Sequence, residues 1–173
     1  GITPAIKGNL PDICEQACIA AKKRGLTISC DLNYRNKLWT RQEAQQTMTR
    51  LLQYADVCIG NEEDAKDVFG IEAKNSDING GSLDQAGYRS VASQLAGRFG
   101  FKKVAITLRS SLSASDNNWA AMLYDGEECL FSKSYTVHIV DRVGSGDSFS
   151  AGLIYSLLNG ADARDALDFA TAA

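Results

Sequence analysis

The chain has 173 residues, of which 45% are hydrophobic and 23% are charged, and 18 basic residues against 21 acidic ones give a net charge of −3. A chain of this size can bury one sizeable core, but so small a net charge supplies no basic surface for nucleic acid or an anionic membrane. No run approaches the roughly 18 apolar residues of a membrane span, and no basic start and apolar stretch of a signal peptide is present. We therefore expect a cytoplasmic protein without nucleic-acid or membrane partners.

Cysteine and histidine chemistry is weakly supported. The five cysteines are odd in number and contain no Cys-x-x-Cys pair, so we expect neither a disulfide framework nor a zinc site, but small buried residues in a reducing compartment. The single histidine, His138, lies in an alternating stretch that favours a position on a strand face over catalysis. Acid–base chemistry is therefore expected from carboxylates.

The first half of the chain alternates helices with short apolar strands. The first helix has an early proline, Pro11, and a terminal glycine, Gly25, and the next is opened by a capping box of Thr40 and Glu43. A Gly-, Asn- and Ser-rich segment over 74–82 is predicted as a surface loop. The patterns predict helices over 10–25, 40–54 and 61–69 and strands over 26–30 and 57–60.

The second half continues the alternation. Ser82 and Gln85 cap a helix to about residue 99, and Asp125-Gly126 is predicted as the turn of a hairpin. The remaining predicted elements are strands over 103–108, 119–124 and 129–135 and two helices separated by Asn159-Gly160. The fold class is therefore α/β, with a mostly parallel sheet flanked by helices and an added β-hairpin. In such sheets ligands bind beyond the carboxyl ends of the strands.

The strongest local signal is the stretch over 141–152, which follows a strand pattern and opens a helix. Gly144 and Gly146 allow a tight turn whose N–H groups, with the helix dipole, favour an anion such as phosphate. Asp147 lies in the same turn, where a carboxylate is useful if it takes the proton of a hydroxyl that attacks a phosphoryl group. Phe149 occupies the place of a third glycine, so the stretch is not a dinucleotide fingerprint, and it is not a Walker A loop. The residues alone also permit a plain glycine turn with a helix-capping aspartate.

This stretch resembles the C-terminal signature of the ribokinase-like (PfkB) carbohydrate kinases, Asp-Thr-x-Gly-Ala-Gly-Asp. The resemblance implies that Asp147 is the catalytic base. It also implies that Asp141 lies near a site for a monovalent cation such as K⁺, and that an anion hole is formed by the amides of Gly144, Ser145 and Gly146.

Two further segments resemble nucleotide-binding motifs of the same family. Asn61 opens a segment similar to the family's Asn-x-x-Glu motif, which orders Mg²⁺ and nucleotide phosphate through water, with Asp64 in place of Glu. Either Asp64 or Glu63 is then the acid that faces the metal, although Asn followed by an acid three residues later is also a helix capping box. Thr107 belongs to a segment similar to the Thr-Leu-Gly that lines the nucleotide, with Arg109 at the usual glycine.

The segment over 31–39 resembles the Asp-x-Asn-x-Arg motif of the family's sugar-acid and fructose kinases, and its continuation is similar to 2-keto-3-deoxygluconate kinases. The resemblance implies that Asp31, Asn33 and Arg35 bind the substrate. An arginine after a strand end can hold a substrate carboxylate with two parallel hydrogen bonds, which a neutral sugar would not need. A surface pair between Arg35 and Asp31 is the alternative.

The resemblance covers the chain from residue 1 to 173 and implies a partial PfkB-type domain with a three-layer ribokinase-like fold. It implies that the N-terminal lid and substrate part and the C-terminal end are missing, so we expect the chain to be inactive by itself. The implied reaction is phosphorylation of 2-keto-3-deoxygluconate to its 6-phosphate by ATP and Mg²⁺. Fructokinase and 5-keto-2-deoxygluconate kinase activities stay open. So do a nucleotide-binding domain without catalysis, a dinucleotide-binding oxidoreductase domain, and assembly as a homo-oligomer.

Overall fold

The computed structural model describes residues 1–72, 85–141 and 143–173, so the predicted loop over 74–82 and the Ser82 cap lie outside the described residues. The helices are α1 (Ile2–Ala5), α2 (Leu10–Lys23), α3 (Arg41–Leu52), α4 (Glu62–Phe69), α5 (Gln85–Phe99), α6 (Ser145–Leu158) and α7 (Ala163–Ala172). The strands are β1 (Ser29–Asp31), β2 (Val57–Asn61), β3 (Lys103–Ser111), β4 (Asp116–Tyr124), β5 (Cys129–Phe131) and β6 (Tyr135–His138). Within this part of the chain, no helix combines the length and apolar character needed to cross a bilayer.

The strands form one mixed sheet in the order β1-β2-β3-β4-β5, with β6 also paired to β4. Strands β1, β2 and β3 are parallel to one another, whereas β4 is antiparallel to β3, β5 and β6. The α/β class with flanking helices is confirmed, but the expected parallel pairing holds only for the half from β1 to β3. Short turns join β3 to β4 and β4 to β5, and strands joined in this way run antiparallel.

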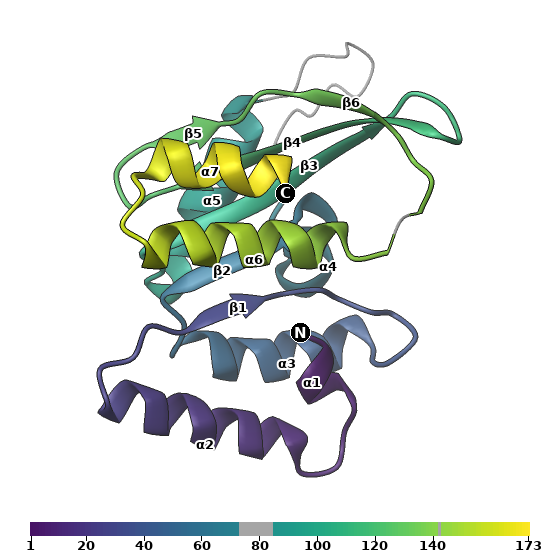
Figure 1. The fold of residues 1–173 in the computed structure, drawn as a ribbon. Helices are drawn as coiled ribbons and strands as arrows, with labels where there is room; N and C mark the ends of the chain where they lie inside the picture. The colour runs from purple at the N-terminus through teal and green to yellow at the C-terminus, as the bar shows by residue number, and fades with distance from the viewer. Residues whose placement is uncertain (73–84, 142) are drawn as a thin grey trace.

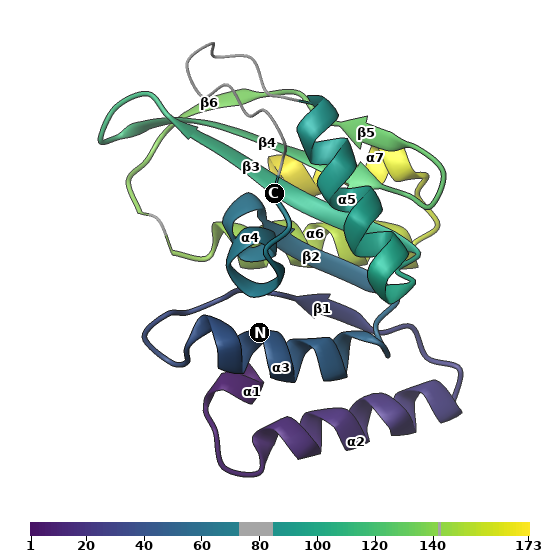
Figure 2. The same ribbon diagram turned by 180° about the vertical axis from the view of Figure 1, so that it is seen from behind.

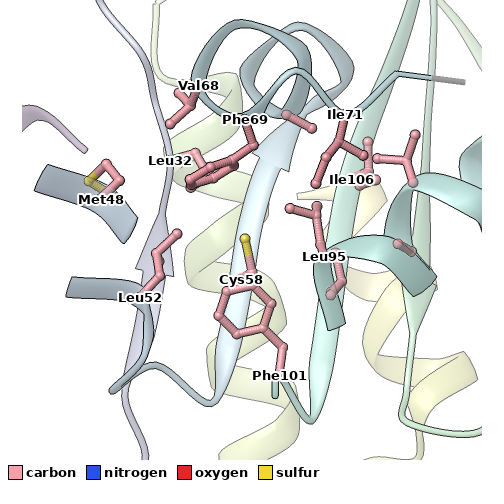
Figure 3. Close-up of a cluster of buried hydrophobic side chains, with 14 of the residues drawn as sticks. Leu32, Met48, Leu52, Cys58, Val68, Phe69, Ile71, Leu95, Phe101 and Ile106 are labelled. Atoms are coloured by element: carbon pink, nitrogen blue, oxygen red, sulfur yellow. The ribbon is translucent and has the colours of Figure 1, made fainter. Parts of the chain in front are cut away.

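Helices cover both faces of the sheet, as the three-layer expectation requires. Side chains on the strands alternate between two buried clusters: Cys58 and Ile106 face the cluster that contains α3, α4 and α5, whereas Ile59 and Ala105 face the cluster that contains α6 and α7. Figure 1 shows α6 and α7 on the near face of β3 and β4, and Figure 2 shows α4 and α5 on the opposite face. Figure 3 shows the first cluster, with Met48 and Leu52 of α3 facing the strands.

Several strand boundaries differ from the predicted ones: β4 begins at Asp116 rather than at residue 119, and the predicted strand over 129–135 is divided into β5 and β6. The first strand begins at Ser29 rather than at residue 26, because the Leu26 N–H donates to the Ala21 carbonyl and so closes the end of α2. The third strand continues to Ser111, because its last residues pair with the start of β4, where Arg109 lies opposite Trp119.

Local sequence signals mark the starts of α3, α4 and α6. The predicted capping box of Thr40 and Glu43 is present at the start of α3. Asn61 and Asp64 form a second capping box at the start of α4. Gly144 caps α6 with a φ of 88°, a left-handed conformation that side chains other than glycine rarely adopt.

The five cysteines and His138 lie outside the lining of the cavity described below. All five cysteines are free; Cys58 is buried as predicted, whereas the other four are only half-buried. Burial raises the pKa of Cys30 to about 11. His138 lies on the exposed strand β6, and its Nδ1 is 2.8 Å from Oδ1 of Asp116 on the paired strand β4, which confirms the strand position.

Candidate active site

One cavity of about 490 Å³ lies where β1, β2 and β3 end and α6 begins. This is the carboxyl edge of the parallel half of the sheet, where ligands of open α/β sheets bind. Every predicted site residue except Asp141 lines it, although the segments that carry them are far apart in the sequence. The lining residues are Asp31, Asn33, Tyr34, Arg35, Ile59, Gly60, Asn61, Glu63, Asp64, Thr107, Arg109, Ser111, Gly144, Ser145, Gly146, Asp147 and Ser150.

The start of α6 provides an anion site beside a carboxylate. The Ser148 N–H donates to the Gly144 carbonyl at 2.8 Å and closes the first turn, so the N–H groups that precede Ser148 have no partner within the helix. These N–H groups and the helix dipole favour a negative charge at this point. Asp147 is exposed in the same turn, so a carboxylate stands next to the position that a phosphoryl group would take.

The loop after β1 is fixed to the neighbouring strand and helix by two hydrogen bonds that its backbone N–H groups donate. The Leu32 N–H donates to the Ile59 carbonyl, and the Tyr34 N–H donates to Oδ1 of Asp64, each at 2.8 Å. Asn33 between them has a φ of 35°, an uncommon conformation for a residue with a side chain. This conformation is part of the path that brings Arg35 to the cavity.

Arg35 is exposed, and no ion pair between Arg35 and Asp31 is found, both residues being described. The surface-pair alternative for Arg35 is therefore not observed. Instead the charge of Arg35 acts on Asp64, where it helps to offset the rise in pKa caused by burial. The guanidinium is thus a cation at the rim of the cavity.

Asp64 and Glu63 have different environments although they are adjacent. Asp64 is 5% exposed, and its two oxygens accept the N–H groups of Tyr34 and Asn61 at 2.8 and 3.1 Å. The capping role is thus realised, and the same carboxylate also holds the loop after β1. Glu63 is exposed at the cavity, so its carboxylate is the accessible one of the pair.

The cavity is rich in carboxylates that influence one another. Burial raises the pKa of Asp31, and the nearby charges of Asp64 and Asp147 raise it further. Burial likewise raises the pKa of Asp64, although hydrogen bonds from backbone N–H groups lower it. Such a site repels a polyphosphate unless a cation accompanies it.

The donor set fits a magnesium ion that reaches the site with a nucleotide. Among the described residues no three His, Cys, Asp or Glu side chains are grouped closely enough to enclose a metal ion. Mg²⁺ does not need such an enclosure, because it usually keeps several waters and binds through one or two carboxylates and the phosphates of a substrate. Glu63 offers an exposed carboxylate for this purpose.

Asp141 lies outside the cavity lining. Its Oδ1 accepts the Val143 N–H at 3.0 Å, so the carboxylate shapes the turn that leads into α6. The monovalent-cation role of Asp141 stays a prediction.

Some lining residues are not among the predicted site residues. Gly60 is the last residue of the predicted strand over 57–60, and Tyr34 lies three residues after the end of β1, so their positions near strand ends could have indicated them. Ser111 lies in the part of β3 beyond its predicted end. Ser150 lies one turn after Asp147 on the same face of α6, which the helical spacing alone indicates.

An open α/β sheet whose glycine-capped helix begins beside a carboxylate has the arrangement expected of a phosphoryl-transfer site. The sequence model of the pfkB family carbohydrate kinases matches residues 5–173, and the chain belongs to this family. The predicted family and the ribokinase-like fold are thereby confirmed, and the oxidoreductase alternative is left without support.

Similar proteins include a 2-dehydro-3-deoxygluconokinase from Thermotoga maritima, whose solved structure is 44% identical with a TM-score of 0.91 and is matched over 99% of this chain and 50% of that one. A 2-dehydro-3-deoxygalactonokinase from Haloferax volcanii is 27% identical over 99% of this chain and 48% of its own length. A solved structure from E. coli, named as a candidate Ribokinase II and holding ATP and Mg²⁺, shares the fold at 23% identity and a TM-score of 0.71, over 97% of this chain and 47% of its own. The chain spans about half the length of these proteins.

Proposed function

We propose that this chain carries the phosphoryl-transfer site of a kinase that uses ATP and Mg²⁺ to phosphorylate a 2-keto-3-deoxy sugar acid, with 2-keto-3-deoxygluconate and its 6-phosphate as substrate and product. One observation carries the proposal: Asp147, the first turn of α6 and Arg35 line the same cavity. A base accepts the hydroxyl proton, an anion site holds the phosphoryl group, and a guanidinium binds a carboxylate, so the three groups together suit phosphoryl transfer to a sugar acid.

In the proposed reaction Asp147 accepts the proton of the substrate hydroxyl. The hydroxyl oxygen forms a bond to the γ-phosphorus while the bond from that phosphorus to the ADP oxygen breaks, and ADP leaves. The first N–H groups of α6, with Gly144, Ser145 and Gly146 in the turn, stabilise the charge on the transferred group. They need no rearrangement to do so, because the left-handed Gly144 already sets the turn.

Asn61 and Thr107, which are paired where β2 ends against β3, are proposed to contact the nucleotide. When bound, Mg²⁺ supplies neutralisation of the phosphate charge. We assign the carboxylate facing the metal to Glu63, because both oxygens of Asp64 already accept backbone N–H groups. Asp64 then acts indirectly, by holding the loop that carries Arg35.

Arg35 is proposed to bind the substrate carboxylate, with Asp31 and Asn33 beside it. Two relatives support an acid as the substrate, since their names refer to 2-dehydro-3-deoxy sugar acids, one derived from gluconate and the other from galactonate. A guanidinium can hold a carboxylate with two parallel hydrogen bonds.

The proposal is tested by ADP release from the full-length protein with 2-keto-3-deoxygluconate, its galactonate epimer, 5-keto-2-deoxygluconate and fructose. We expect turnover with the keto-deoxy acids, and Arg35→Ala should raise their KM by about tenfold or more while changing turnover of fructose little. Equal loss for fructose would reject the carboxylate role. ATP binding without ADP release from any substrate would instead favour a nucleotide-binding domain without catalysis.

A further inference from the structure

Arg109 places a second guanidinium at the cavity, on the side opposite to Arg35. It lies on β3 two residues beyond Thr107 and two before Ser111, so the three side chains share one face of the strand. All three line the cavity. Arg35 follows β1, and β1 and β3 lie on either side of β2, so the two arginines reach the cavity from its two flanking strands.

A fixed aromatic platform supports Arg109. Its guanidinium carbon lies 5.8 Å from the ring centroid of Trp119, which is its register partner on β4. The Trp119 ring is itself held, because its indole N–H donates to the Thr171 carbonyl at 3.0 Å and its edge meets Phe149 with ring centroids 6.5 Å apart. A cation held over an aromatic face keeps its planar donor group oriented.

This platform connects Arg109 to the anion site. Phe149 is fully buried and follows Asp147 by two residues on α6. The chain of contacts from Arg109 through Trp119 therefore ends at Phe149, one residue after the turn of α6 proposed to hold the phosphoryl group. Arg109 and the first turn of α6 line the same cavity.

The N–H groups of the Arg109 guanidinium are available to a ligand. None of the ion pairs between described residues includes Arg109, although four carboxylates line the same cavity, namely those of Asp31, Glu63, Asp64 and Asp147. Its side chain is exposed to the cavity rather than turned into the core. An arginine without a carboxylate partner, in the same cavity as a helix start that attracts anions, is suited to a ligand with phosphate oxygens.

We propose that Arg109 binds the phosphate chain of the nucleotide, donating hydrogen bonds to its oxygens from the wall next to the α6 amides. The inference rests on the proposed kinase function. It assigns the two arginines of the cavity to different ligands: Arg35 binds the carboxylate of the sugar acid, and Arg109 binds the nucleotide. Arg109 then offsets part of the repulsion that the four carboxylates exert on a polyphosphate.

The test compares Arg109→Met and Arg109→Lys with the wild type in the full-length protein. Methionine keeps an unbranched stem over Trp119 but removes the charge, and lysine keeps the charge but loses the planar fork. Arg24→Ala is the matched control, since Arg24 is an exposed arginine of the α2 end, bonded to the Ala20 carbonyl and outside the cavity. KM values for ATP and for the sugar acid are measured, together with calorimetric Kd values for ATP, ADP and adenosine.

For Arg109→Met we expect KM and Kd for ATP to rise about tenfold or more, as for loss of a charge-assisted hydrogen bond. Binding of ADP should weaken as well, whereas Kd for adenosine and KM for the sugar acid should stay within about twofold of wild type. For Arg109→Lys, KM and Kd for ATP should lie between the values of the wild type and of Arg109→Met. Unchanged ATP affinity in an active enzyme, an equal loss for adenosine, or a rise confined to KM for the sugar acid would each overturn the inference. A wild type that neither binds ATP nor releases ADP would instead overturn the proposed function.

Discussion

Asp147 is an exposed carboxylate in the first turn of α6, beside the amides proposed to hold the phosphoryl group. Asp147→Asn keeps the shape and removes the proton acceptor, so kcat should fall by about 10² to 10⁴ while Kd for ATP changes little. Initial rates and ATP calorimetry on the full-length protein measure both quantities. Asp165→Asn is the control, because Asp165 occupies the first turn of α7, away from the cavity. A kcat within about tenfold of wild type would contradict the base assignment.

Glu63 and Asp64 allow a matched comparison between adjacent acids. In Asp64→Asn one buried N–H, of Tyr34 or Asn61, would face an NH₂ group, and the free energy of unfolding should fall by about 1 to 3 kcal/mol. Glu63→Gln should leave unfolding nearly unchanged but raise the Mg²⁺ concentration needed for half-maximal activity. Urea titrations and magnesium-dependent rates separate the two effects. The assignment is wrong if Asp64→Asn alone alters the magnesium requirement.

That the motif residues lie in one site could be predicted from the sequence, because the carboxyl ends of parallel strands meet at one edge of the sheet. Arg35 follows β1, Asn61 ends β2, and Thr107 lies opposite Asn61 where the pairing of β2 and β3 ends. Parallel strands in one sheet bring these positions together. The division of roles between Glu63 and Asp64 could not be predicted, because it depends on the Tyr34 N–H, which reaches Asp64 only in the folded loop.

At the scale of elements, capping signals predicted helix starts well. The Thr40 and Asn61 capping boxes are local interactions that the folded chain preserves. The β3–β4 hairpin was missed because its polar residues after Leu108 do not alternate with apolar ones and are fixed as strand only by pairing with β4.

Asp56 is a buried carboxylate that joins three elements. Its Oδ2 lies 2.7 Å from Nζ of Lys22 on α2 and accepts the Ile28 N–H ahead of β1, and its Oδ1 lies 3.3 Å from Nζ of Lys102 ahead of β3. Burial by itself would raise the pKa of Asp56, but these hydrogen bonds lower it below its ordinary 3.8. The interaction is thus expected to fix α2 to the edge of the sheet.

The lowered pKa sets the sign of a pH dependence. Above the ordinary pKa Asp56 contributes stability, and this contribution is lost as the pH falls through the lowered pKa of the folded state. Asp56→Asn should therefore lower the free energy of unfolding by about 1 to 3 kcal/mol near neutral pH, and the difference from wild type should shrink in acid. Urea unfolding by tryptophan fluorescence between about pH 2.5 and 7 measures it. Asp12→Asn, which removes an exposed pair with Arg50, should show neither effect.

At the scale of the whole molecule, the cavity lies at one edge of a sheet that carries a buried cluster on each face. The strands whose ends line it contribute side chains to both clusters, as Cys58 and Ile59 of β2 do, and α6 closes it from the second one. A ligand bound there contacts the loop after β1, α4, β3 and α6 at once. Binding should therefore stabilise the folded state as a unit rather than one element of it.

A ligand that binds only the folded state at one hundred times its Kd adds about 2.7 kcal/mol to the free energy of unfolding. For the full-length protein we expect ATP with Mg²⁺ to raise Tm by about 5 °C or more, with a smaller rise when the metal is chelated, because the cavity carboxylates then repel the nucleotide. Mg²⁺ alone controls for the metal, and NAD tests the dinucleotide alternative. Thermal melting that responds equally to NAD, or to neither nucleotide, would contradict a site organised around the phosphates of ATP.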